Sequence, residues 1–216
     1  YRIFTSERLT CLVLDRRGNA RLLVPALEAP RAALAAPDLE TLPWHETEDP
    51  FARLATLVGG TGPIAVADQM WASFVLRLQA ALPGRSMVPA TTVTRELRMR
   101  KETAEIVALR DAARAADLAF ARACAAPFAG RSEREVAEEL AAALRATGHE
   151  EVLFTIVGSG PNGASPHHQS GDRRLASGDA VVLDFGGTRA RYCSDITRTV
   201  HVGDAPDAEL RRVHGI

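Results

Sequence analysis

The spacing of apolar residues divides the chain into two regions with different patterns. Residues 9–93 alternate short apolar runs with short amphipathic stretches, which is typical of strands alternating with helices in an α/β unit. The next region has longer amphipathic stretches, followed by three apolar, strand-like runs at 152–157, 180–185 and 192–202. Helices followed by a group of strands indicate an α+β domain.

The first region begins with a predicted hairpin. Apolar runs at 9–14 and 21–24 flank Asp15-Arg16-Arg17-Gly18-Asn19, a turn-forming stretch with a central glycine. The other elements expected here are a helix at 49–58 that starts at Asp49-Pro50, a strand at 64–67, a helix capped by Asp68 that ends at Leu82, and a strand at 88–93.

The second region is predicted to open with two helices. A single helix is expected over 96–126, because apolar side chains recur there at intervals of three and four. Ser132 and Glu135 form a capping-box pattern, so a second helix should begin there and end at Gly148. A further helix is expected from Asp204 onward. We place the domain boundary so that the domains are 1–95 and 96–216.

Composition and charge exclude several functional classes. The 216 residues are 46% hydrophobic and 25% charged, with a formal net charge of −1, so nothing favours non-specific binding to nucleic acid or to a membrane surface. No apolar run approaches the roughly 20 residues that span a bilayer. The cysteines Cys11, Cys124 and Cys193 lie far apart, which argues against a disulfide framework or a thiolate zinc site. A reducing, cytoplasmic location is therefore expected.

The candidate chemistry lies in a pair of carboxylates near a predicted hairpin. Asp184 interrupts an apolar strand, where an unpaired carboxylate would be costly. A two-residue turn at Arg189-Ala190 would set Asp184 directly opposite Asp195, with Cβ atoms roughly 4.5–5.5 Å apart. Two carboxylates this close repel each other unless cations lie between them. Two bridged divalent metals would remove that penalty and would also activate a water nucleophile. The alternative is that Asp184 pairs with Arg198 or Arg191 and only orders the strand ends.

Two motifs resemble a known family. Asp184-Phe185-Gly186-Gly187 together with the stretch 192–199 resembles the signature hairpin of the pita-bread metallopeptidases, which include aminopeptidase P and prolidase. The upstream stretch 156–168, which ends in Pro166-His167-His168, is similar to the substrate-facing segment of that family. The resemblance implies part of an α/β creatinase-type N-terminal domain, followed by part of an α+β pita-bread catalytic domain.

The resemblance also implies roles for single residues. Asp184 and Asp195 match the first two metal ligands of the family, and His167 matches the histidine that contacts substrate and steadies the tetrahedral intermediate. His168 is the weaker candidate for that role. Apart from the resemblance, Thr197 lies two residues past Asp195 on the same sheet face, so it is expected either to orient that carboxylate or only to fill the strand as a β-branched residue. The family's other ligands, one His and two Glu, have no match in the residues after Thr199, so we expect the 216-residue chain by itself to be inactive.

The implied activity is metal-dependent hydrolysis of X-Pro peptide bonds, by an Xaa-Pro dipeptidase or aminopeptidase. Two divalent metal ions are expected, with manganese first and cobalt or zinc as alternatives. A proline-containing peptide is the expected substrate, and a homodimer the expected assembly. Two other functions stay open: a creatinase-like amidinohydrolase, which needs no metal, and a catalytically silent binding module. The aspartate pair argues against both.

Overall fold

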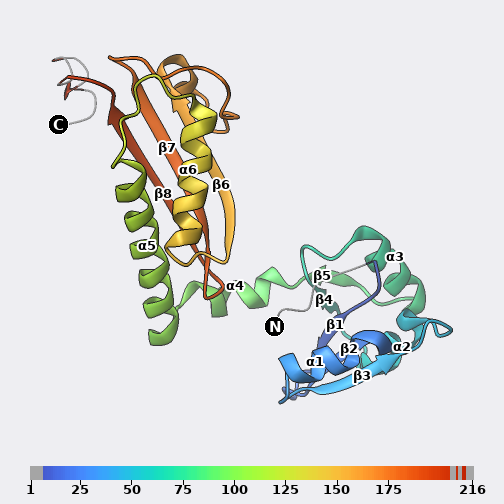
Figure 1. Ribbon diagram of the computed structural model, residues 1–216. Helices are drawn as coiled ribbons and strands as arrows, with labels where there is room; N and C mark the ends of the chain where they lie inside the picture. Colours follow the sequence, from blue (N-terminus) through green and yellow to red (C-terminus); the bar gives the residue numbers. More distant parts are fainter. Residues whose placement is uncertain (1–6, 205–207, 209–210, 213–216) are drawn as a thin grey trace. The chain divides into compact units, whose positions relative to one another are not determined.

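The computed structural model describes residues 7–204, 208, 211 and 212, which belong to two compact units, Tyr1–Arg100 and Lys101–Ile216 (Figure 1). The division lies five residues beyond the boundary expected from the sequence, because helix α4 (Thr91–Met99) stays with the first unit. The helix expected from Asp204 onward falls largely outside the described residues, although Ala208, Arg211 and Arg212 are helical.

The first unit contains a mixed three-stranded sheet. Strands β1 (Cys11–Leu14) and β2 (Ala20–Pro25) pair antiparallel, which confirms the predicted hairpin. Strand β3 (Glu40–Trp44) then pairs parallel to β2. Neither this strand nor the crossover before it was predicted from the sequence pattern; the crossover consists of η1 (Ala26–Glu28) and α1 (Ala29–Ala35).

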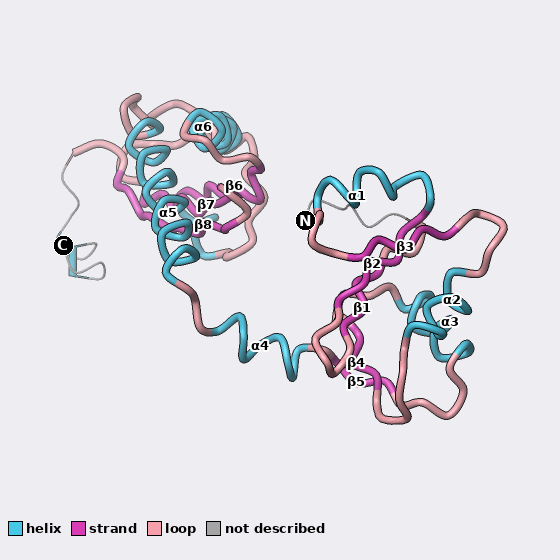
Figure 2. Tube along the Cα trace, turned by 90° about the horizontal axis from the view of Figure 1, so that it is seen from below, coloured by secondary structure: helices cyan, strands magenta, loops and turns pink. Residues whose placement is uncertain are grey.

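Helices cover both faces of this sheet (Figure 2). Leu23 and Trp44 face helices α2 (Pro50–Leu57) and α3 (Ala72–Ala81) in one buried cluster. The opposite face of β2 packs on α1 in a second cluster, which consists of Leu22, Val24 and Ala32. Because strands with alternating faces can bury both sides only between two layers of helices, the unit is a three-layer α/β domain.

Of three predicted element ends in this unit, one is confirmed and two are wrong. The Asp49 side chain accepts a hydrogen bond from the Phe51 N–H at 3.0 Å, so the predicted start of α2 is confirmed. The helix expected from Asp68 begins instead at Ala72, with Trp71 at the N-cap position. The strand expected at 88–93 is wrong beyond Pro89, where β5 (Met87–Pro89) ends beside its parallel partner β4 (Ile64–Val66). Proline has no N–H to continue a ladder, and α4 starts two residues later.

The second unit has two helices before its sheet, α5 (Thr103–Ala123) and α6 (Glu133–Ala146). The single helix expected over 96–126 is wrong, because Arg100 is extended and a capping box formed by Glu102 and Glu105 starts α5 afresh. The predicted capping box of α6 is confirmed: Ser132 Oγ accepts from the Glu135 N–H at 3.1 Å, and Glu135 accepts from the Ser132 N–H at 2.7 Å.

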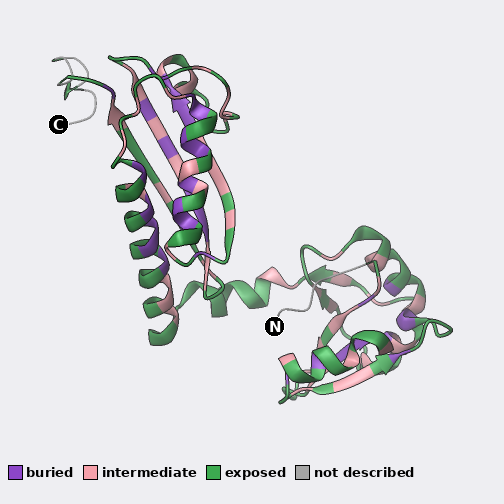
Figure 3. Cartoon of the chain, in the orientation of Figure 1, coloured by how far each residue is buried: buried purple, intermediate pink, exposed green. Residues whose placement is uncertain are grey.

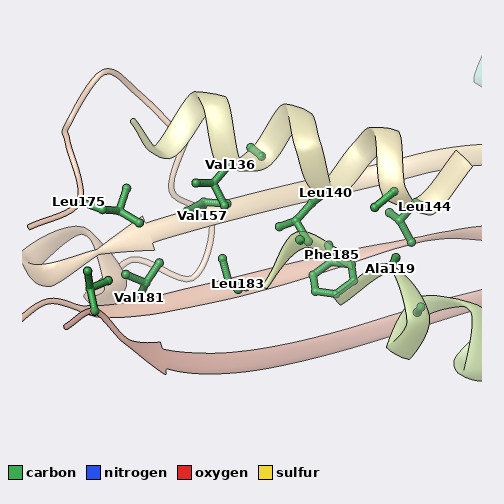
Figure 4. Close-up of a cluster of buried hydrophobic side chains, with 14 residues drawn as sticks. Ala119, Val136, Leu140, Leu144, Val157, Leu175, Val181, Leu183 and Phe185 are labelled. Atoms are coloured by element: carbon green, nitrogen blue, oxygen red, sulfur yellow. The ribbon is translucent and has the colours of Figure 1, made fainter. Parts of the chain in front are cut away.

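An antiparallel sheet follows, in the order β6 (Glu151–Ser159), β7 (Ala180–Arg189) and β8 (Tyr192–His201). The short helix η2 (Gly160–Ala164) follows β6 directly. Helices α5 and α6 both lie on one face of this sheet (Figures 1 and 2). The core fills the space between these two layers (Figure 4), and the buried positions of α5 and α6 lie on the sides of the helices that face the strands (Figure 3).

Alternation along β7 determines which side chains enter this core. Val181, Leu183 and Phe185 are fully buried against the helices, so Asp184 and Gly186 belong to the opposite face. In helix α5 the buried positions are all alanines, which lets its backbone lie close to the strands. The second unit therefore has one helix-covered face and one face that no described helix of this unit covers. Within the described residues, no helix is long and apolar enough to cross a membrane.

Candidate metal and substrate site

The carboxylates of Asp184 and Asp195 lie on the sheet face opposite the helices. Asp184 is half-buried, while Asp195 is exposed. Their neighbours on the same strands, Phe185 and Ser194, are buried on the helix side. Two carboxylates on one face offer hard oxygen donors of the kind that divalent cations prefer. They fit as two ligands of a metal site. Among the described residues, no third His, Cys, Asp or Glu joins them in a group.

The predicted pairing of these two residues is wrong by two residues. Asp184 lies opposite Thr197, and Asp195 lies opposite Gly186, so the carboxylates are diagonal neighbours. Such neighbours are roughly 7–8 Å apart along the strands, a distance that long side chains and bridging ions still span. The cause is the turn. Its central residues are Ala190 and Arg191, with φ of 49° and 69°, rather than Arg189 and Ala190. A shift of two in the pairing preserves the face, because side chains alternate with a period of two.

Thr197 orients Asp184 rather than Asp195. Its hydroxyl donates a hydrogen bond of 2.7 Å to Asp184 Oδ1. The expectation that Thr197 orients Asp195 is wrong, because Thr197 lies directly opposite Asp184 in the neighbouring strand. The hydroxyl fixes one carboxylate oxygen and leaves Oδ2 for another partner. The competing ion-pair interpretation also weakens, since Arg198 donates to Asp117 of α5 at 2.9 Å, on the helix side of the sheet.

A buried histidine supports the hairpin from the helix side. The Nε2 atom of His149 is 2.8 Å from Ser194 Oγ, and its Nδ1 is 3.1 Å from the Leu144 carbonyl oxygen. A carbonyl oxygen only accepts, so Nδ1 carries the proton and Nε2 accepts from Ser194. Burial lowers the pKa of His149 below its usual 6.5, the nearby Arg189 acts in the same direction, and the bond to Leu144 opposes them. The neutral imidazole therefore anchors the residue next to Asp195. His149 was not predicted as a site residue from the sequence.

His167 and His168 have different environments. The His168 Nε2 donates to the Glu133 carboxylate at 2.7 Å, and its side chain is only 20% exposed. The His167 residue is exposed and lines an open groove of about 460 Å³. The groove is bounded by α6, by β6 and by the segment 167–170; its lining includes Arg134, Glu138, Phe154 and Ile156. Of the two histidines, His167 is the one with its ring available to a ligand.

The structure brings the two aspartates together but places His167 at a neighbouring feature. Ile156, in the groove lining, pairs with Asp184 across the β6–β7 ladder. Residues paired directly share a sheet face, so this side of the groove adjoins the aspartate face. Neither aspartate lines the groove itself.

Glu133 is a second buried polar residue that the sequence pattern did not predict. It is the first residue of α6 and is completely buried, with five hydrogen bonds to its carboxylate. Acidic residues in a first helical turn are common, and usually exposed to solvent. No local pattern distinguishes this one, because its partners lie 26 to 38 residues further along the chain.

Comparison with known families matches both units. Residues 3–100 match the creatinase/prolidase N-terminal domain, and residues 107–216 match metallopeptidase family M24. The probable dipeptidase PepE of Mycobacterium tuberculosis is 44% identical over 218 residues, covering 98% of this chain and 57% of that protein.

Solved structures are similar over nearly the whole chain. The dipeptidase PepE from Mycobacterium ulcerans has a TM-score of 0.89 at 43% identity, covering 99% of this chain and 58% of its own. An Xaa-Pro dipeptidase from Bacillus anthracis has a TM-score of 0.85 at 28% identity, covering 98% and 59% respectively. The chain therefore spans somewhat more than half the length of these relatives.

Proposed function

This chain belongs to metallopeptidase family M24, with a creatinase-type domain before its pita-bread domain, and from that premise we propose that the whole protein hydrolyses X-Pro peptide bonds. The observation that carries the proposal is the pair Asp184 and Asp195 on one sheet face that no described helix of the unit covers. Proteins of this family generally use divalent metal ions, and the two aspartates are the residues of this chain that would hold them.

The metal ions would supply one part of the chemistry. When bound, they lower the pKa of water and polarise a carbonyl oxygen, so a nucleophile is available near neutral pH. Two ions, with manganese first, suit the hard carboxylate donors. The chain's own contribution is to hold the carboxylates in place. Thr197 fixes Asp184 by its 2.7 Å hydrogen bond, and the His149–Ser194 pair anchors the strand beside Asp195.

His167 is proposed to act on the substrate. An imidazole that donates a hydrogen bond stabilises the negative charge that develops on the carbonyl oxygen as the peptide bond is attacked. The exposure of His167 on a groove beside β6 supports this role, because an extended peptide could lie there. His168 is excluded from the same role by its bond to buried Glu133.

The preference for proline rests on the relatives, since one is an Xaa-Pro dipeptidase and others are dipeptidases. A homodimer and a cytoplasmic location also stay predictions. A mass measurement by light scattering tests the first, and fractionation of the source cells tests the second.

The decisive experiment replaces each aspartate in the whole protein. Asp184→Asn and Asp195→Asn keep side-chain size but remove the charge that a divalent cation needs. We expect the hydrolysis of an X-Pro dipeptide, assayed with added Mn²⁺, to fall by at least about 10³-fold in either variant. Asp111→Asn, at an exposed position of α5, is the matched control and should stay near the wild-type rate.

Full activity of Asp184→Asn or Asp195→Asn, with normal metal content, would refute the assignment. Turnover of an amidino substrate that survives removal of metal by a chelator would favour the metal-free amidinohydrolase instead. Stable folding with no turnover of either substrate class would favour a binding module.

A further inference from the structure

The Glu133 carboxylate is the centre of a buried polar network. Its Oε1 accepts from the Ser159 N–H at 2.8 Å, from the Ser159 hydroxyl at 2.7 Å and from the Asn162 amide at 2.9 Å. Its Oε2 accepts from His168 Nε2 at 2.7 Å and from the Gly171 N–H at 3.2 Å. Burial by itself would raise the pKa of Glu133, but the donors from Asn162, His168 and Ser159 together lower it to about 2. The carboxylate is therefore ionised, and its buried charge is satisfied by hydrogen bonds.

The donors to Glu133 all come from one stretch of chain. Ser159 ends β6, Asn162 lies in η2, and His168 and Gly171 follow. One carboxylate therefore ties the start, the middle and the end of the segment 159–171. The exposed His167 lies within that segment, directly before a residue whose ring is bonded to Glu133.

A second ion pair fixes the Ser159 hydroxyl. Arg173 forms two hydrogen bonds to Asp179, at 2.7 and 2.9 Å, and also donates to Ser159 Oγ. The Ser159 hydroxyl therefore accepts from Arg173 and donates to Glu133, so its orientation is determined. Gly160 has a φ of +51°, and a Cβ there would be 2.8 Å from the Arg173 guanidinium, so the chain passes close to this pair.

Other bonds hold the same segment independently of Glu133. The backbone N–H groups of Glu133 and Arg134 donate to the carbonyls of Arg173 and Gly171, each at 3.0 Å. The Val157 N–H donates to Ser170 Oγ at 2.8 Å. The segment 159–171 should therefore stay folded when the Glu133 carboxylate is changed. The side chains that Glu133 binds, including that of His168, should become more mobile.

We propose that Glu133 is a positioning residue for His167: through His168, Asn162 and Ser159 it holds the segment 159–171 so that the His167 imidazole faces the substrate groove. This inference rests on the role proposed above for His167. A donor must lie within a few tenths of an ångström of its productive place, and a misplacement of about 1 Å can cost roughly 10²-fold in rate.

The test is a double-mutant cycle in the whole, metal-loaded protein. Glu133→Gln keeps the shape but replaces one acceptor oxygen by a donor, so at least one of the five donors loses its partner. The matched control is Glu135→Gln, two residues along the same helical turn. Glu135 caps α6 through the Ser132 N–H, and within the described part of the chain its carboxylate makes no hydrogen bond to the segment 159–171.

We expect Glu133→Gln to lower kcat about tenfold, with a change in KM of less than about threefold and unchanged metal content. In a His167→Ala background, the same substitution should lower kcat by less than about twofold, because there is no imidazole left to position. Glu135→Gln should change kcat little in either background. An equal loss of kcat in both backgrounds would overturn the proposal and make Glu133 merely structural.

Two further measurements test the same proposal independently of the double-mutant cycle. Amide hydrogen exchange of the segment 159–171 should accelerate in Glu133→Gln; unchanged exchange together with a lower kcat would overturn the proposal. If Glu133→Gln does not fold, His168→Leu should reproduce the loss that depends on His167, and His168→Gln, whose amide can still donate, should recover part of it. An equal loss in His168→Leu and His168→Gln would also overturn it.

The two hypotheses fail in different ways. If His167→Ala leaves kcat unchanged, the role of His167 fails and Glu133 has nothing to position. If both aspartate variants keep full activity, the proposed metal function fails. That result comes from variants separate from the Glu133 double-mutant cycle, so the two failures can be told apart.

Discussion

Single residues determine how the two aspartates face each other. Ala190 and Arg191 take the central positions of the β7–β8 turn with positive φ values of 49° and 69°. Residues other than glycine, asparagine and aspartate adopt this left-handed region at a cost of roughly 1–2 kcal/mol each. Two-residue turns with positive φ at both positions nevertheless match the twist of the strands. The turn is therefore strained at Ala190 and Arg191, and the strand register that it sets keeps Asp184 and Asp195 on one face of the sheet.

A relaxed turn sequence should stabilise the protein without changing the site. We expect the double variant Ala190→Asn, Arg191→Gly to raise the free energy of unfolding by about 1 kcal/mol, because Asn-Gly is the favoured pair for this turn. Urea unfolding of the whole protein measures the change. Arg191→Ala, which removes the arginine but not the strain, should give no gain. A less stable double variant would contradict the account of the turn.

Among the helices and strands, the features that depend on local sequence were predicted, and those that depend on distant partners were not. The Asp49 N-cap and the Ser132–Glu135 capping box were predicted correctly because their partners lie within three residues. Strand β3 was missed since Pro43 breaks its pattern and its partner β2 pairs from a distance. The face of Asp184 and Asp195 followed from alternation alone, which survives a shift of two. Their exact pairing depended on the turn, and Arg-Ala and Ala-Arg are both poor turn sequences.

The buried groups of the site were beyond prediction for the same reason. Glu133 finds its partners 26 to 38 residues away, and His149 finds Ser194 45 residues away, so only the assembled sheet and helices bring them together. A charged residue at the start of a helix and a histidine after Gly148 are unremarkable in the sequence. Their burial is a property of the packed elements.

His149 lies in the loop between α6 and β6, and it should make the free energy of unfolding depend on pH. Its folded pKa lies below its ordinary 6.5, so near that pH the unfolded chain binds more protons than the folded chain. Stability is therefore highest above about pH 6.5 and should fall as the pH decreases through that value. Unfolding of the whole protein at about pH 7.5 and about pH 5.5 measures the difference.

His149→Gln provides the comparison for this pH dependence. A glutamine amide can donate to the Leu144 carbonyl and accept from Ser194 without titrating, so the loss of stability at lower pH should shrink. His201→Gln, in the same unit, leaves His149 intact and should retain it. An unchanged pH dependence in His149→Gln would show that another group is responsible.

At the scale of the whole molecule, each unit has its own core. The buried clusters of the first unit combine residues between Leu9 and Leu78, and that of the second combines residues between Ala116 and Val202. Among the described residues, no buried cluster draws on both units. Stabilisation that originates at Asp184 and Asp195 should therefore be confined to the second unit.

In the whole protein, metal binding should stabilise the second unit without stabilising the first. A ligand at 100 times its Kd stabilises the folded state that binds it by about 2.7 kcal/mol. We expect added Mn²⁺, compared with chelator, to slow amide hydrogen exchange about tenfold or more in β7 and β8, while exchange in β1, β2 and β3 stays the same. The effect should disappear in Asp184→Asn and in Asp195→Asn but persist in Asp111→Asn. Equal slowing in both units would mean that the units are energetically coupled. No slowing in either unit, at a Mn²⁺ concentration that supports turnover, would mean that the metal is held by residues other than this aspartate pair.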